Sequence, residues 1–146
     1  FTACGELPTV RADATRLQQV LHNLLHNAAK HAGAAGRKPR VTLSASLEGG
    51  EVVVAVRDNG KGIPEEKLGI VFEPFVRLRG ESSSAGLGIG LSTVRRAVEG
   101  WGGRVWAESE PGKGSIFFFT LPPGSAPDTR QELPPRLRGS GEINTA

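Results

Sequence analysis

The chain has 146 residues, which is one domain's worth, and its hydrophobic content of 38% is enough for a core. Its single cysteine, Cys4, excludes an internal disulfide framework, and no apolar run approaches the length of a membrane span. The net charge of +3 comes from basic residues that are scattered rather than clustered, so we expect neither nucleic-acid binding nor direct membrane contact from this chain.

Residues 13–31 carry the pattern of an amphipathic helix, and residues 1–12 before it are predicted to be a strand end and a loop. Asp13 stands where a helix N-cap belongs, and Gly33 where a helix-ending glycine belongs. Apolar residues recur at helical spacing between them and form a core stripe, namely Leu17, Val20, Leu21, Leu24, Leu25 and Ala28.

Beside that stripe, Asn23, Asn27 and Lys30 fall at i, i+4 and i+7 and share a sector of roughly 60°. Asparagine is a mediocre helix former, so two asparagines aligned on one flank need a reason. One reason is function, with amide oxygens holding a hard cation and the ammonium reaching for phosphate. The other reading is an ordinary solvated face.

The three histidines of this segment differ in their expected surroundings. His31 borders the apolar stripe and is placed to touch a ligand bound beside it. His22 and His26 lie further round the helix, and we expect them to face solvent.

Residues 41–58 are predicted to form a β-hairpin that turns at Gly49-Gly50. Its first strand alternates as a half-buried strand through Val41, Leu43, Ala45 and Leu47, and its second is a buried apolar run, Val52 to Val56.

The second strand ends at Asp58-Asn59-Gly60-Lys61-Gly62-Ile63-Pro64. Glycine permits a positive φ and lets a ligand lie close to the main chain. A carboxylate facing such a gap suits a flat ligand that offers an N–H donor, and an adenine amino group is one. The alternative is an Asx turn, in which Asp58 only caps its own loop. These seven residues alone leave both readings open.

Pro64, Glu65 and Glu66 are predicted to begin a short helix that is broken by Phe72-Glu73-Pro74-Phe75. A polar stretch over residues 76–85 follows. A glycine-rich run, Gly86 to Leu91, then leads into a helix that ends at Gly102-Gly103. A glycine-rich loop entering a helix is an anion-binding arrangement, because free N–H groups and the helix dipole face the same place. The alternative is a flexible connector.

Residues 104–110 and 115–121 are predicted to form a second hairpin across Pro111-Gly112-Lys113-Gly114. Pro122-Pro123 stops its second strand, and the remainder is rich in proline, glycine and charge. We therefore expect one domain over residues 1–122 and a disordered tail or linker over residues 123–146.

Four motifs in this order resemble the catalytic, ATP-binding domain of bacterial sensor histidine kinases, over about residues 7–122. They are the asparagine box Asn23–His31, the first glycine box Asp58–Ile63, the phenylalanine box Phe72–Phe75 and the second glycine box Gly86–Leu91. The resemblance implies the Bergerat ATP-binding fold of the GHKL superfamily. That is an α+β, two-layer α/β sandwich with a mixed, mostly antiparallel sheet, helices on one face, and ATP between the helices and a lid over residues 73–86.

The same resemblance implies ATP and Mg²⁺ as ligands. Asn27 would ligate the metal, Lys30 and Arg77 would act catalytically at the phosphates, Asp58 would bind the adenine amino group, and Ser115 would reach the adenine through water. The nucleotide-binding residues that it implies are Asn23, Asn27, Lys30, His31, Asp58, Gly60, Gly62, Ile63, Gly86, Leu87, Gly88, Gly90, Leu91 and Ser115.

One position separates the branches of this superfamily. Hydrolytic members carry a glutamate one helical turn before the magnesium asparagine, and this chain has Asn23 there. An amide cannot take a proton from water, so the resemblance favours transfer of the γ-phosphate to a histidine over hydrolysis. There are two alternatives. One is a nucleotide-binding regulatory module that transfers no phosphate, and the other is an ATPase or serine kinase of the same superfamily.

The phosphoacceptor is expected outside this chain. The family's acceptor histidine is followed by an acidic residue, whereas His22 and His26 precede Asn and His31 precedes Ala. We therefore expect a separate phosphoacceptor and dimerisation domain as the direct partner and a response regulator as an indirect one. The expected location is cytoplasmic, either in a cytoplasmic protein or as the cytoplasmic domain of a membrane-bound sensor. Because the chain begins at Phe1 and the family domain begins further upstream, we also expect a fragment that lacks a helix and most of a first strand.

Overall fold

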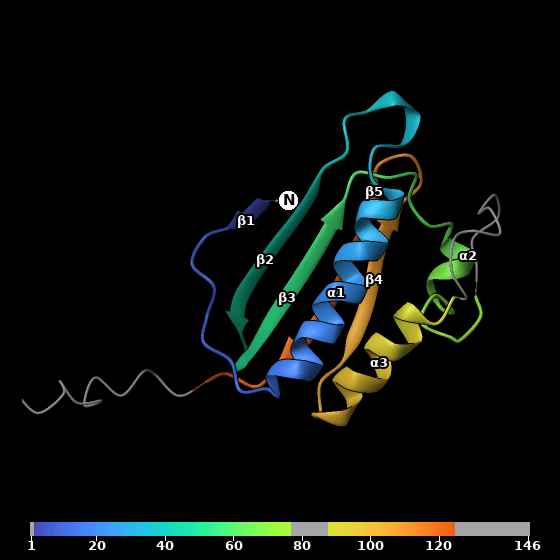
Figure 1. Ribbon diagram of the computed structural model, residues 1–146. Coiled ribbons are helices and arrows are strands. Elements are labelled where there is room, and N and C mark those ends of the chain that lie inside the picture. The colour runs from blue at the N-terminus through green and yellow to red at the C-terminus, as the bar shows by residue number, and fades with distance from the viewer. Residues whose placement is uncertain (1, 77–87, 125–146) are drawn as a thin grey trace, which may run out of the picture.

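The computed structural model describes residues 2–76 and 88–124, and these form a single sheet with the two longer helices on one side (Figure 1). The strand order is β1-β2-β3-β5-β4; β1 runs parallel to β2, and the other neighbouring pairs are antiparallel. The elements in chain order are β1 (Thr2–Cys4), α1 (Ala14–His31), the 3₁₀ turn η1 (Ala34–Gly36), β2 (Val41–Glu48), β3 (Glu51–Asp58), α2 (Glu65–Leu68), α3 (Gly90–Gly100), β4 (Val105–Glu110) and β5 (Gly114–Leu121).

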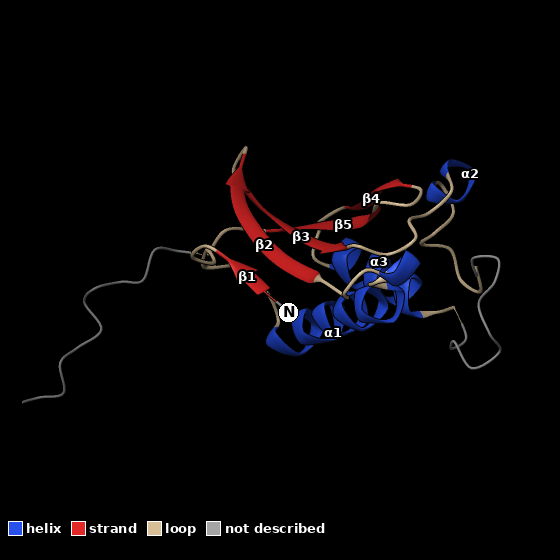
Figure 2. Cartoon of the chain, turned by 90° about the horizontal axis from the view of Figure 1, so that it is seen from above, coloured by secondary structure: helices blue, strands red, loops and turns tan. Residues whose placement is uncertain are grey.

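The two longer helices, α1 and α3, lie together on one face of this sheet, as the view from above shows (Figure 2). The core lies between the two layers, and its members are Val20, Leu24, Ala28, Val41, Val52, Val54, Val56, Ile63, Val71, Val94, Val98, Phe117, Phe119 and Leu121. The predicted α+β sandwich, with a mixed and mostly antiparallel sheet, is confirmed.

Helix α1 begins and ends where the sequence predicts. Asp13 is its N-cap, and the Asp13 carboxylate accepts the N–H of Arg16 at 2.9 Å. Ala32 is its C-cap, and Gly33 follows in the left-handed region with φ 81°, which glycine adopts without steric cost. The apolar stripe turns inward, because Val20, Leu24 and Ala28 are buried.

Strand alternation carries two polar residues onto the helix-covered face of the sheet. Successive side chains of a strand point to opposite faces, so Asp58 shares a face with the buried Val54 and Val56. Ser115 shares a face with the buried Phe117 and lies directly opposite Asp58 in the β3–β5 register. The side chains of Asp58 and Ser115 therefore both point toward the helix layer at one end of the sheet.

Two local expectations differ from the structure. Helix α2 is a single turn that ends at Leu68, before the phenylalanine box, because Gly69 caps it. Leu47 is 63% exposed rather than half-buried, and it lies near the end of β2, beyond the residues Thr42–Ser44 that pair with β1.

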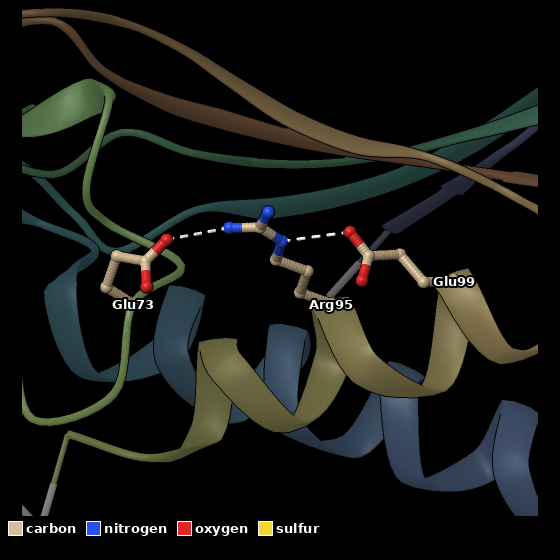
Figure 3. A network of polar contacts seen from close by, with 3 residues as sticks. All are labelled: Glu73, Arg95 and Glu99. Carbon is tan, nitrogen blue, oxygen red and sulfur yellow. Dashed lines mark hydrogen bonds and ion pairs between the residues drawn. The ribbon is translucent and has the colours of Figure 1, made fainter.

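An ion pair joins the segment after α2 to α3. Arg95 of α3 contacts the Glu73 carboxylate at 2.8 Å and the Glu99 carboxylate, one turn along its own helix, at 2.9 Å (Figure 3). The two carboxylates raise the pKa of the Arg95 guanidinium, with Glu99 the larger cause. Glu73 of the phenylalanine box is thereby held against the helix that the second glycine box opens.

The longest helix, α1, carries charge and amide groups along its length, and no helix in the described residues is both long and apolar enough to cross a membrane.

The last described residues pair with a segment near the start of the chain. Gly124 donates its N–H to the carbonyl of Thr9 at 2.8 Å, and Val10 forms a β-bridge with Pro123. The residues just after β5 therefore pair with the segment that leads into α1.

Candidate functional site: a cavity between the helices and the end of the sheet

A cavity of about 260 Å³ opens where α1, the start of α3 and the ends of β3 and β5 meet. It gathers residues that the sequence places in three separate motifs. Its lining consists of Asn23, His26, Asn27, Lys30, His31, Asp58, Lys61, Gly62, Ile63, Val71, Val76, Gly88, Ile89, Gly90, Leu91, Ser115 and Phe117.

Asp58 lies at the sheet side of this cavity and is 4% exposed. Its Oδ1 accepts the N–H of Gly60 at 2.8 Å, so the Asx turn that the sequence left open is present. Desolvation by burial raises the pKa of the Asp58 carboxyl above its ordinary value, and the backbone N–H groups of Gly60 and Ser115 partly offset this rise. The turn does not remove Asp58 from the cavity, so one carboxylate both caps the loop and faces the cavity.

The two glycines after Asp58 are required by neighbouring backbone rather than by the cavity alone. A Cβ on Gly60 would lie 2.2 Å from the carbonyl oxygen of His31, so only glycine fits against the end of α1. Gly62 has φ 77°, and a Cβ there would lie 2.5 Å from the Glu110 carbonyl oxygen. Gly60 therefore lies behind the cavity wall, whereas Gly62 and Ile63 line the cavity.

Ser109 supports that wall, and sequence reasoning missed it. Its Oγ accepts the N–H of Ile63 at 2.7 Å and donates to the carbonyl of Gly114 at 2.8 Å. The Ser109 Oγ also lies 3.0 Å from the Oγ of Ser115. One hydroxyl thus joins the loop after β3 to the β4–β5 hairpin, and no local pattern in residues 104–110 indicates this.

Asn59 and Arg37 join the loop between α1 and β2 to the first glycine box and to the turn between β4 and β5. The Asn59 amide oxygen accepts the N–H groups of Gly33 at 3.1 Å and Arg40 at 2.9 Å, and its amide nitrogen donates to the carbonyl of Lys38 at 2.9 Å. The Arg37 guanidinium donates to the carbonyls of Gly60 at 3.0 Å and Gly112 at 2.7 Å. These bonds fix the position of the first glycine box relative to the end of α1.

The polar flank of α1 faces the cavity, as the functional reading of the asparagine box predicts. Asn23, Asn27, Lys30 and His31 all line it. His26, which we expected to face solvent, is exposed but also borders the cavity, because it lies one helical turn from both Asn23 and Lys30.

The start of α3 forms the remaining side of the cavity. Gly88, Gly90 and Leu91 line it, and a Cβ on Gly90 would lie 3.9 Å from the amide oxygen of Asn23. Phe75 donates its N–H to the carbonyl of Gly88 at 2.9 Å, so the residues on either side of the segment 77–87 are bonded to each other. The first N–H groups of an α-helix lack partners within the helix and attract anions.

The predicted site residues Arg77, Gly86 and Leu87 lie outside the described residues, as do most of the predicted lid over residues 73–86 and residues 125–146 of the predicted tail. The other predicted site residues, apart from Gly60, meet at the one cavity.

The donor set around the cavity suits a hard cation shared with a ligand. The described residues contain no group of three or more His, Cys, Asp and Glu side chains that would bind a metal ion by themselves. Mg²⁺ keeps several waters and is bound through one or two protein oxygens together with substrate phosphates. A single amide oxygen from Asn27, on the cavity wall, fits that mode.

A cavity that joins an asparagine-bearing helix, a buried strand-end aspartate and a glycine-rich helix start defines a class of ATP-binding domain. The chain belongs to the family described as histidine kinase-, DNA gyrase B-, and HSP90-like ATPases, whose model it matches over residues 12–125. Within that family it is a catalytic domain of the sensor histidine kinase type, as its relatives and structural neighbours show.

Two curated relatives are sensor kinases. The chain is 44% identical over 118 residues to the adaptive-response sensory kinase SasA of Synechococcus elongatus, a match that covers 81% of this chain and 30% of SasA. It is 38% identical over 117 residues to the alginate biosynthesis sensor protein KinB of Pseudomonas aeruginosa, covering 80% of this chain and 19% of KinB. The chain thus spans less than a third of either relative.

Solved structures agree with these relatives. The catalytic domain of histidine kinase ThkA matches with a TM-score of 0.68 and 32% identity, over 84% of this chain and 77% of that one. Full-length ShkA, in complex with AMPPNP, matches with a TM-score of 0.70 and 35% identity, over 85% of this chain and 25% of that one. The resemblance proposed from the sequence is confirmed.

Proposed function

We propose that this domain binds Mg-ATP and transfers the γ-phosphate to a histidine on a separate dimerisation and phosphoacceptor domain, as part of a two-component pathway. The observation that carries this proposal is the cavity itself, where Asn23, Asn27 and Lys30 of α1 face Asp58 of β3. A relative of the same fold binds the ATP analogue AMPPNP, which supports the choice of nucleotide.

The adenine end of the nucleotide would lie at Asp58. Its carboxylate would accept the adenine amino group, Gly62 and Ile63 would form the adjacent wall, and Ser115 would reach the base through water. Burial of Asp58 strengthens such a bond, because few competing waters surround it. A charge-assisted bond of this kind contributes roughly 1.5–3 kcal/mol.

The phosphate end would lie between α1 and α3. Asn23, Lys30 and the first N–H groups of α3 would contact phosphate oxygens, and His31 would flank the nucleotide. Asn27 would hold Mg²⁺, which when bound neutralises phosphate charge during transfer. Lys30 would add a fixed positive charge at the same place, and the predicted lid group Arg77 would approach from the segment that follows Val76.

Asn23 favours transfer over hydrolysis. A water needs a general base within hydrogen-bond reach, and an amide does not accept a proton. A histidine nucleophile brought by another domain needs positioning and charge neutralisation instead, which Lys30 and the bound metal would provide.

The partners and the location follow from this function. A phosphohistidine made by the domain would be consumed by a response regulator, so the domain is proposed to work in the cytoplasm, where ATP is available. The single cysteine fits such a reducing compartment.

Phosphotransfer from γ-labelled ATP to an added histidine-bearing hairpin domain, taken from one of the relatives, tests the proposal. The expected result is stoichiometric, acid-labile label on the hairpin, lost when Asn27→Ala is used and lost when the acceptor histidine is replaced by Gln. Sustained phosphate release without the hairpin would identify an ATPase instead. Nucleotide binding without any transfer would identify a regulatory module.

A further inference from the structure

His22 and His26 form a stacked pair on the exposed side of α1. Their ring centroids lie 6.1 Å apart with an interplanar angle of 17°. Both side chains are exposed, and they are one helical turn apart on a helix whose opposite side is buried through Val20 and Leu24. The backbone that carries the two imidazoles is therefore held in place by the core.

Two imidazoles at i and i+4 on a helix can chelate one metal ion once the exposed rings turn from the stacked pose so that one nitrogen of each points at the ion. The same spacing carries the two zinc-binding histidines of helical His-x-x-x-His motifs. Imidazole nitrogen suits Zn²⁺ and similar borderline ions, whereas Mg²⁺ prefers oxygen. The chemistry of this pair thus differs from that of Asn27, which offers an amide oxygen to a hard cation.

We propose that His22 and His26 bind a borderline divalent metal ion such as Zn²⁺, at the rim of the nucleotide cavity and separate from the Mg²⁺ position. The two histidines supply two ligands, and water or a phosphate oxygen completes the coordination. Because His26 also lines the cavity beside Asn23 and Asn27, the ion adds positive charge near the phosphate end of the site.

The site is tested by titrating the full chain with Zn²⁺ alone, by calorimetry, in a Cys4→Ser background that removes the exposed thiol. His22→Gln and His26→Gln are each expected to weaken Zn²⁺ binding about tenfold or more, since even outer-shell partners of metal ligands are worth about ten- to a hundredfold. His31→Gln is the matched control and should leave the affinity unchanged. Unchanged Zn²⁺ affinity in either His22→Gln or His26→Gln overturns the site.

Ring signals of the three histidines give a second readout that does not depend on affinity. In an NMR titration with Zn²⁺, the signals of His22 and His26 should move together and those of His31 should not. Movement of one histidine alone, at equal Zn²⁺, contradicts chelation by the pair. A thermal melt of each variant shows that it is folded, as expected for exposed positions.

The effect on nucleotide rests on the proposed function and is measured separately. Saturating Zn²⁺ should strengthen AMPPNP binding to the parent chain but not to His22→Gln, and AMPPNP should strengthen Zn²⁺ binding by the same factor. Zn²⁺ binding at the pair without any change in AMPPNP affinity would refute the coupling and leave the metal site standing. Absence of AMPPNP binding under all conditions would refute the proposed function instead.

Discussion

Asp58 accepts the N–H of Gly60 through Oδ1 at 2.8 Å, so the carboxylate that faces the cavity also holds the loop that follows it. An amide in its place keeps an oxygen for that bond but loses the charge. Asp58→Asn should therefore weaken ATP-analogue binding roughly ten- to a hundredfold, the size of one charge-assisted bond, while the fold is kept. Calorimetric titration measures this, with Asp13→Asn as a control that preserves an N-cap. Unchanged affinity would remove Asp58 from the adenine site.

The same variant should change how stability depends on pH. Burial raises the pKa of the Asp58 carboxyl above its ordinary value of 3.8 in the folded state. Between the unfolded and the folded pKa the native state binds more protons, so this group's contribution to stability is present below the unfolded pKa and is lost as pH rises through the folded pKa. Asp58→Asn should thus be more stable than the parent at neutral pH, and the difference should shrink toward pH 3.8. Urea unfolding at several pH values checks this, and a difference that grows on acidification would contradict it.

Gly60→Ala should destabilise the domain, because its Cβ would lie 2.2 Å from the carbonyl oxygen of His31, which is backbone and cannot turn away. Overpacking of this kind costs about 1–3 kcal/mol, occasionally more. Gly69→Ala is the matched control, since nothing lies within 4 Å of its Cβ position and its φ is −67°. Urea unfolding compares the two free energies of unfolding. Equal values would show that the loop does not pack against α1 as described.

Ser109→Ala should loosen the cavity wall, because it leaves the N–H of Ile63 without its 2.7 Å acceptor. Because the bond is only partly buried, its loss should cost toward the lower end of the range of about 1–3 kcal/mol for a buried group. The same substitution at Ser46, an exposed residue of β2, should cost much less. We also expect weaker ATP-analogue binding in Ser109→Ala alone, measured by calorimetry. Equal stability of the two variants would remove the role given to Ser109.

Arg95 and Glu73 form an exposed ion pair at 2.8 Å, so their coupling should be small and sensitive to salt. A double-mutant cycle with Arg95→Gln and Glu73→Gln should give a favourable coupling at low ionic strength. That coupling should vanish at about 1 M salt, where the Debye length is about 3 Å. Arg96→Gln, at an exposed neighbour that forms no ion pair within the described part of the chain, is the control. Coupling that persists at high salt would indicate a contact other than charge.

The sequence by itself determined the elements and the motif positions. Helical spacing from Leu17 to Ala28 fixed α1, and the buried run from Val52 carried the chain to Asp58, because periodicity is a local property that neighbouring residues express directly. The family motifs then predicted which residues meet, and the residues that the structure describes confirm the fold.

The tertiary structure decided how the cavity wall is held and why some residues are needed. Arg37 reaches the carbonyl of Gly112, 75 residues away, and Ser109 accepts from Ile63, 46 residues away. Glycine is required at position 60 because a side chain there would clash with the carbonyl oxygen of His31. His26 lines the cavity because α1 lies over the end of the sheet. Such contacts depend on the relative placement of distant backbone segments, which no local pattern of residues encodes.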